Sequence, residues 1–243
     1  MNDLYRWLQR DFLMAELDVC CPDFQGGYNA EPAPPTTKPF GELVVATALE
    51  EWGHNVHEPR GTPNRIDRYI RGAFGLDWST ADAINWAPDT PYTRDGMFQW
   101  CGAFAAHCWG TAGIKASIRK KKLASTARLR SWGRGTERMV TVPDDLRPGD
   151  IVVVSRGKKR QGEHICIVEH VNHAAKLVHT IEGNAKGLGP DGTVFEGVIK
   201  RTRPWPRANG GLGRRSGQTC PVSGLRQSAE IVGAYRPLPE DFA

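Results

Sequence analysis

The chain has 243 residues, of which 40% are hydrophobic and 24% are charged, and its formal net charge is +5. This composition is ordinary for a globular chain, and the length suffices for one well-buried domain with additions. No apolar run approaches the roughly 18 residues that a membrane-spanning helix needs. The mild positive charge favours an ordinary basic surface, with association with anionic wall polymers as the alternative.

The N-terminal part, residues 1–39, differs in pattern from the rest. Residues 3–17 have the spacing of an amphipathic helix, with Leu4, Leu8 and Phe12 on one side. Residues 31–39 contain four prolines (EPAPPTTKP) and cannot be helical, so we expect a linker there. The helix either packs on the outside of the following domain or serves as a docking segment for a carrier or partner.

The same N-terminal stretch shows no signal peptide, because Arg6, Arg10, Asp11 and Glu16 interrupt any apolar core. We therefore expect synthesis in the cytoplasm. If the substrate lies outside the cytoplasm, another system must deliver the protein to the periplasm or the cell wall.

Residues 40–243 predict one domain that begins with helices and ends with strands. Helical spacing covers residues 40–52 and 65–74, with Asn64 as N-cap of the second helix, and a third helix begins at Cys101. Short strands then follow at residues 151–155, 164–171, 176–183, 194–202 and 230–235. We predict an α+β domain in which helices pack on a small curved antiparallel sheet, with a glycine-rich insertion at residues 207–228.

Cys101 is the first candidate for chemistry. It follows a glycine-containing turn and opens a helix of small residues. Unpaired N–H groups and the helix dipole favour an anion there, so the thiol ionises more readily and its thiolate can attack a carbonyl. Taken alone, a cysteine in such a helix is more often a core residue than a nucleophile.

A histidine and an acid follow on predicted strands. His164 lies on an apolar strand, and Glu182 and Asn184 alternate onto one face of the next strand. Glu182 is the favoured partner to orient His164 and Asn184 the alternative, because a carboxylate stabilises imidazolium better than an amide. His164 meets Glu182 directly if Val171 pairs with Ala175. A loop of two or four residues between these strands would instead put the side chains of His164 and Glu182 on opposite faces of the sheet, unless a bulge intervenes.

Five segments resemble, in order, the signature blocks and closing strand of the CHAP family: 100–104 (WCGAF), 146–152 (LRPGDIV), 163–168 (EHICIV), 180–184 (TIEGN) and 233–237 (GAYRP). Members of this family are papain-like cysteine amidases and endopeptidases of the NlpC/P60 superfamily, and most act on bacterial cell-wall peptides. The resemblance implies a papain-like fold, Cys101 as nucleophile, His164 as base and Glu182 as the third member of a triad.

Other residues near Cys101 are candidates for supporting roles. Its own backbone N–H would stabilise an oxyanion, with Gln99 as a second donor and Trp100 as neighbouring support. Trp78, Trp86 and Tyr92 precede the cysteine and would line a substrate groove, although aromatic residues in such positions are more often core.

We expect no metal, no cofactor and no nucleic-acid partner. Cys101, Cys108, His107 and Cys166 do not have the spacing of a zinc site, and no acidic loop of the kind that binds calcium precedes Cys101. The basic run at residues 119–122 contains no aromatic residue, which indicates a solvated loop. The six cysteines form no disulfide pattern, which favours a reducing compartment.

These observations predict a cysteine-dependent hydrolase of peptidoglycan amide bonds, either an amidase or an endopeptidase, of the kind found as phage lysins or antibacterial effectors. One alternative is an intracellular cysteine peptidase or amidase that uses the same triad on a protein or small amide. The other is a catalytically inactive module that retains the fold for wall binding.

Overall fold

The computed structural model describes residues 39–58, 63–74, 100–123, 125–155, 163–189, 192–204 and 230–243. The predicted helix at residues 3–17, almost all of the proline-rich linker and the insertion at residues 207–228 lie outside this part of the chain. The domain boundary predicted near residue 40 is therefore not tested, and the fold below is that of the domain after it.

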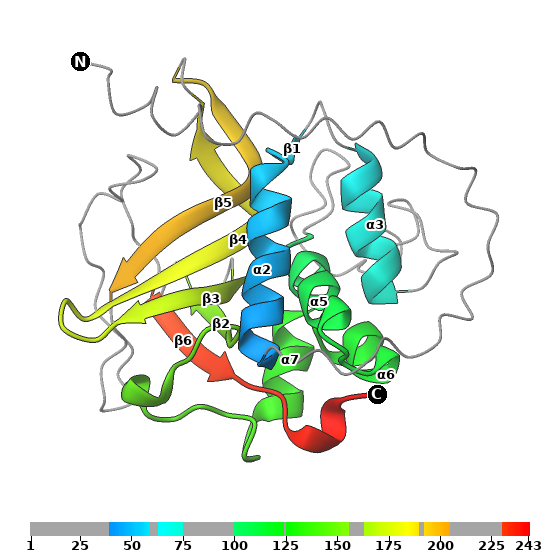
Figure 1. Ribbon diagram of the computed structural model, residues 1–243, viewed down its shortest axis with the longest axis vertical. Helices are drawn as coiled ribbons and strands as arrows, with labels where there is room; N and C mark the ends of the chain where they lie inside the picture. Colours follow the sequence, from blue (N-terminus) through cyan, green and yellow to red (C-terminus); the bar gives the residue numbers. More distant parts are fainter. Residues whose placement is uncertain are drawn as a thin grey trace. The chain divides into compact units, whose positions relative to one another are not determined.

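The helices come first, as predicted (Figure 1). The structure has α2 (Phe40–Gly53), α3 (Pro63–Phe74), α5 (Cys101–Thr111), α6 (Ala116–Ile118) and α7 (Thr126–Gly133). Helix α3 begins two residues before the predicted start, because Pro63 is compatible with a first helical turn. Among the described residues, no helix has the length and apolarity needed to cross a membrane.

The basic run at residues 119–122 is not the loop that its charge predicted. It belongs to a π-helical turn, Arg119–Leu123, whose last residue is fully buried. Arg119 donates to the carbonyl of Gly72 at 3.3 Å. Packing of Leu123 and this contact with α3 give the segment a regular structure that local charge alone does not indicate.

The strands form one antiparallel sheet in the order β1-β5-β4-β3-β2-β6. Its members are β1 (His57–Glu58), β2 (Ile151–Ser155), β3 (His164–Asn172), β4 (Leu177–Leu188), β5 (Val194–Pro204) and β6 (Glu230–Tyr235). The short edge strand β1 was not predicted, since two residues carry no periodic signal. Helices followed by an antiparallel sheet confirm the predicted α+β class.

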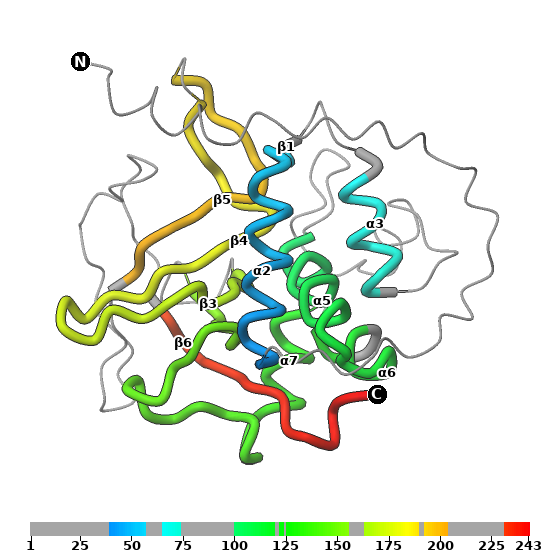
Figure 2. Tube along the Cα trace, viewed as in Figure 1, coloured from blue at the N-terminus to red at the C-terminus, as the bar shows by residue number. Residues whose placement is uncertain are grey.

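Both faces of the sheet are buried at its centre. Alternate residues such as Ile165 and Ile167 join the core formed with the helices, while Cys166 and Val168 belong to a second apolar cluster. Helices α2 and α5 contact each other, and both contact β3 and β4 (Figure 2). The first turn of α5 is thereby held close to the start of β3.

A buried charge cluster joins helices α2, α3 and α5. Glu51 of α2 is 2% exposed and accepts hydrogen bonds from Tyr69 at 2.5 Å and Arg65 at 2.6 Å, both on α3. Burial alone would raise the pKa of Glu51, but His107 of α5, Tyr69 and Arg65 outweigh it and lower that pKa to about 2. The ring of Tyr69 also packs 5.8 Å from that of Trp100, directly before Cys101.

Two glycines, Gly41 and Gly149, allow the backbone of α2 to touch the turn that precedes β2. Gly149 has a φ of +86°, and a Cβ placed on it would lie 2.6 Å from the Cα of Gly41. The Gly149 carbonyl accepts from the Trp109 indole at 2.9 Å, and its N–H donates to Val168 of β3 at 2.9 Å. This turn therefore fixes α2, α5 and β3 relative to one another.

We predict that Gly149→Ala destabilises the domain by more than its backbone conformation alone explains. Gly135→Ala is the matched control, since Gly135 has a φ of +69° and a Cβ placed on it would meet nothing within 4 Å. The control should cost roughly 1–2 kcal/mol for the left-handed conformation. Gly149→Ala should cost a further 1–3 kcal/mol or so for the clash with α2, measured by denaturant unfolding. Equal losses in the two variants would contradict the proposed contact.

Candidate active site

Cys101 is the first residue of α5, and its thiol is directed toward the beginning of β3. The helix has no side-chain cap at Trp100, so its first N–H groups remain available. The sulfur interacts with the His164 side chain and with the backbone at Ile165 and Gly102. The residue is only 7% exposed, so its ionisation is governed by these neighbours rather than by bulk water.

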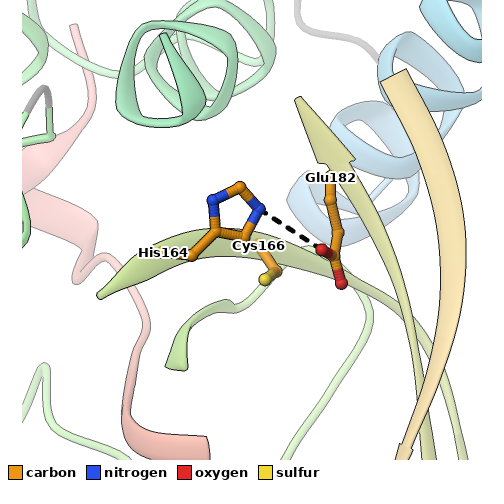
Figure 3. Close-up of side chains that lie close together, drawn as sticks. All are labelled: His164, Cys166 and Glu182. Carbon is orange, nitrogen blue, oxygen red and sulfur yellow. Dashed lines mark ion pairs between the residues drawn. The ribbon is translucent and has the colours of Figure 1, made fainter. Parts of the chain in front are cut away.

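His164 is the first residue of β3 and links the thiol to a carboxylate. Its Nε2 atom lies 3.3 Å from Oε2 of Glu182 on β4, the contact that is dashed in Figure 3. Nε2 makes no hydrogen bond of good geometry, so the hydrogen bond with Cys101 belongs to Nδ1. The imidazole thus has one nitrogen toward the nucleophile and the other toward an acid.

The register that brings His164 and Glu182 together is not the predicted one. Val171 pairs with Val178 rather than with Ala175, so residues 173–176 form the loop. A four-residue loop alone would put the side chains of His164 and Glu182 on opposite faces of the sheet. A bulge between Val168 and His170 returns them to the same face. Continued past Ile167↔Ile181, this register places Cys166 opposite Glu182 and His164 diagonal to it, a separation that long side chains can span.

The three groups shift one another's pKa in the directions a thiol nucleophile needs. Burial raises the pKa of Cys101, but the charge and hydrogen bond of His164 outweigh it and lower that pKa. Burial lowers the pKa of His164, but the charge and hydrogen bond of Cys101, followed by those of Glu182, raise it. A thiolate–imidazolium pair is therefore favoured over the neutral pair.

Glu182 is held by groups that the sequence did not point to. Its Oε1 accepts from Arg203 Nε at 2.9 Å and Nη2 at 2.5 Å and from the Thr180 hydroxyl at 2.7 Å, while Arg201 Nε lies 3.8 Å from Oε2. Burial raises the pKa of Glu182, but the Arg203 charge, then His164 and Arg201, hold it well below its usual range. The carboxylate is thus ionised although it is fully buried.

Asn184 supports the nucleophile rather than the imidazole. Its Oδ1 accepts from the backbone N–H of Trp100 at 3.2 Å, and its Nδ2 donates to Glu196 at 3.3 Å. The residue has a φ of +55° within the irregularity between Glu182 and Ala185. This bulge turns the amide toward the backbone of Trp100, so Glu182, not Asn184, is the group beside His164.

The remaining predicted residues fall into two groups. Trp100 is fully buried and is a core residue whose indole packs near Tyr69; its backbone N–H is already bonded to Asn184 and cannot serve an oxyanion. The other candidates, in the supporting and groove roles, lie outside the described residues: Gln99, Trp78, Trp86 and Tyr92.

His164, Cys166 and Glu182 also present metal-ligand atoms within 4.8 Å of one another. Cys166 is 1% exposed, and burial, with the negative charge of Glu182, raises the pKa of its thiol well above the usual range. Both carboxylate oxygens of Glu182 already face cationic groups, and the Arg203 guanidinium opposes a second cation there. The donor set therefore fits an ion-pair network better than a metal site.

Two buried arginines, Arg201 and Arg203, are the part of the site that sequence reasoning missed. Charged residues near a strand end ordinarily indicate a solvent-facing edge. The alternate spacing of the two arginines is the signal that could have placed them near Glu182. Positions 199, 201 and 203 share the sheet face of positions 178, 180 and 182 once β4 and β5 are paired. Recognising this requires the register, which the sequence did not provide.

We predict that Cys101 is alkylated selectively at mildly acidic pH. Because the pKa of Cys101 is lowered, whereas burial raises the pKa of Cys108 and of Cys166, the Cys101 thiolate forms at a lower pH than the other two. Iodoacetamide followed by peptide mapping should modify Cys101 at least about tenfold faster than these two. In His164→Ala only the backbone hydrogen bonds at Ile165 and Gly102 still oppose the effect of burial, so the reaction should shift to alkaline pH. Equal labelling of all three thiols in that mildly acidic buffer would contradict the ion pair.

We also predict that Asn184→Gly weakens the nucleophile without loosening the fold. Glycine accepts the positive φ but removes the acceptor for the Trp100 N–H, so the alkylation rate of Cys101 should fall about tenfold through misplacement of the thiol. Asn55→Gly is the control, because Asn55 also has a positive φ of 51° and is exposed after α2. If both variants retain the wild-type rate, the Asn184 contact has no role in placing Cys101.

Comparison with known families agrees with the resemblance noted from the sequence motifs. Residues 92–184 match the family model of the CHAP domain, a span that contains Cys101, His164, Glu182 and Asn184 but ends before β5 and β6. It is narrower than the similarity expected from the five sequence segments. Comparisons with curated proteins and with solved structures gave no match. Over residues 92–184, the chain is therefore similar to the CHAP domain.

Proposed function

We propose that this protein is a cysteine-dependent hydrolase that cleaves an amide bond in the peptide part of bacterial peptidoglycan. The observation that carries the proposal is the thiol of Cys101 at the N-terminus of α5, hydrogen-bonded to His164, which in turn faces Glu182 at 3.3 Å. The CHAP match at residues 92–184 supports the substrate class, since most members of the family that the sequence motifs resemble act on bacterial cell-wall peptides.

In the first half of the reaction, the Cys101 thiolate attacks the amide carbonyl carbon and forms a C–S bond. The carbonyl oxygen takes up the electron pair, and the N–H groups at the start of α5, including that of Cys101, are the donors best placed to stabilise it. The imidazolium of His164 then gives its proton to the amide nitrogen. The C–N bond breaks, the amine leaves, and an acyl thioester remains on Cys101.

In the second half, neutral His164 takes a proton from water, whose oxygen attacks the thioester carbonyl. Collapse of the tetrahedral intermediate breaks the C–S bond, releases the carboxylic acid and restores the thiolate–imidazolium pair. Glu182 does not exchange a proton in either half. Its fixed negative charge stabilises His164 in the charged form at the start and end of the cycle.

The finer parts of the proposal rest on the sequence. They are the choice between amidase and endopeptidase, an origin as phage lysin or antibacterial effector, and delivery to the wall by a carrier that docks on residues 1–39. An intracellular cysteine peptidase would use the same three side chains on another amide. A wall-binding module without activity would retain the fold but not an ionised thiol.

We predict that Cys101→Ala abolishes solubilisation of purified sacculi, with a loss of at least about a thousandfold, because the nucleophile is removed. Cys108→Ala is the matched control: this cysteine is buried on the same helix, and burial, with the charge of Glu51, raises the pKa of its thiol. Cys108→Ala should retain activity within a few-fold. The measurement is release of soluble fragments, with their masses identifying the bond that is cut.

The outcomes separate the three functions. Fragments that depend on Cys101 support the proposal. Thiol-dependent cleavage of denatured protein but not of sacculi would replace it with the peptidase alternative. Binding to sacculi without fragments, together with a Cys101 that is not alkylated in mildly acidic buffer, would indicate the inactive wall-binding module.

A further inference from the structure

Glu182 and Arg203 form an ion pair that is almost completely removed from water. Glu182 is 0% exposed and Arg203 is 1% exposed, and their shortest contact is 2.5 Å. Placing an ionised carboxylate in such a site carries a large desolvation penalty unless an opposite charge and hydrogen bonds compensate it. Without compensation a buried carboxyl group takes up a proton instead. The guanidinium is therefore what allows Glu182 to carry a charge there.

The contacts divide the two oxygens of Glu182 between two tasks. Oε1 accepts from Nε and Nη2 of Arg203 and from the Thr180 hydroxyl, so it is fully occupied. Oε2 accepts no hydrogen bond of good geometry and lies 3.3 Å from His164 Nε2. Because the guanidinium is planar and binds Oε1 through two nitrogens, it fixes the carboxylate so that Oε2 faces the imidazole.

We propose that Arg203 is a positioning residue of the reaction: it keeps Glu182 ionised and aims its second oxygen at His164, and thereby sets the pH at which the Cys101 thiolate forms. The inference rests on the proposed function in that it assigns catalysis to the same three side chains. Arg203 lies on β5, beyond the residues matched by the CHAP family model, so this part of the site is added by the chain outside that match.

The charged and titratable neighbours of Glu182 come from three strands. His164 and Cys166 face it from β3, and Arg201 and Arg203 from β5, while Thr180 precedes it on β4. Cys166 is protonated because burial raises the pKa of its thiol. Arg201 is the weaker cation for this purpose, since its Nε is 3.8 Å from Oε2 and its Nη2 bonds the carbonyl of Lys186.

The first test is the pH profile of Cys101 alkylation by iodoacetamide in Arg203→Met. Loss of the guanidinium lets Glu182 take up a proton, so imidazolium is less stabilised and the pKa of Cys101 rises. The midpoint of the profile should move up by at least about one unit, which is a tenfold slower reaction below the midpoint. Arg203→Lys retains a cation and should recover at least half of that shift. A wild-type midpoint in Arg203→Met, or no recovery in Arg203→Lys, would overturn the proposal.

The double variant Arg203→Met/Glu182→Gln tests whether Arg203 acts through Glu182. Both buried charges are removed together, which favours folding even where the single variant is unstable. If Glu182 is already neutral in Arg203→Met, replacing it by glutamine should leave the midpoint within about 0.3 unit of the single variant. A further shift of a unit or more would mean that Glu182 stays ionised without Arg203, and the proposal would be wrong.

Arg236→Met is the control for general loosening of the fold. Arg236 binds the buried carboxylate of Asp150 through Nη2 at 2.7 Å and Nε at 2.8 Å, so the variant breaks a partly exposed arginine–carboxylate pair away from the thiol. It should lower the melting temperature but leave the midpoint of Cys101 alkylation unchanged. An equal shift of that midpoint in Arg236→Met and Arg203→Met would mean that the Arg203 effect comes from general loosening of the fold, and it would overturn the proposal. Because the assay needs no substrate, inactivity on sacculi would reject the proposed substrate without altering this result.

Discussion

A line of buried charges, Cys101–His164–Glu182–Arg203, connects the candidate nucleophile to the centre of the sheet. Each member is stabilised in its ionised form by the next, and burial opposes the ionised form of every one of them. The line alternates in sign and runs from the first turn of α5 across β3 and β4 to β5. The reactivity of the thiol is therefore a property of four elements rather than of one helix terminus.

The surrounding fold supplies the rigidity that this line requires. The contact between Gly41 and Gly149 lets α2 approach the turn before β2, and the same turn bonds Trp109 of α5 and Val168 of β3. On the other side, Asn184 fixes the amide that precedes Cys101. The nucleophile and the imidazole are thus anchored separately, so that their contact does not have to hold the two elements together.

Glu51 is another buried carboxylate of the domain, and comparing it with Glu182 shows what distinguishes the two. Glu51 and Glu182 are both ionised through bonds to arginine, and each has a histidine beside it. His107, however, lies further along α5 than Cys101. The thiol next to it in sequence, that of Cys108, has its pKa raised by burial and by the charge of Glu51. Among the described residues, only at Cys101 does a histidine stand between the carboxylate and the sulfur.

The α+β class, most strand limits, the helix that begins at Cys101 and the CHAP resemblance could all be predicted from the amino-acid sequence, because periodicity, turn residues and short motifs are local properties of the chain. The sequence also singled out Cys101, His164 and Glu182 as one group. It could not determine the register, since the bulge after Val168 arises only when β3 and β4 pair with their neighbours. For the same reason the contacts of Asn184 with Trp100 and of Arg203 with Glu182 could not be predicted, because each joins two segments that are distant in the sequence. These polar contacts become strong only in the folded chain, where water is excluded from them.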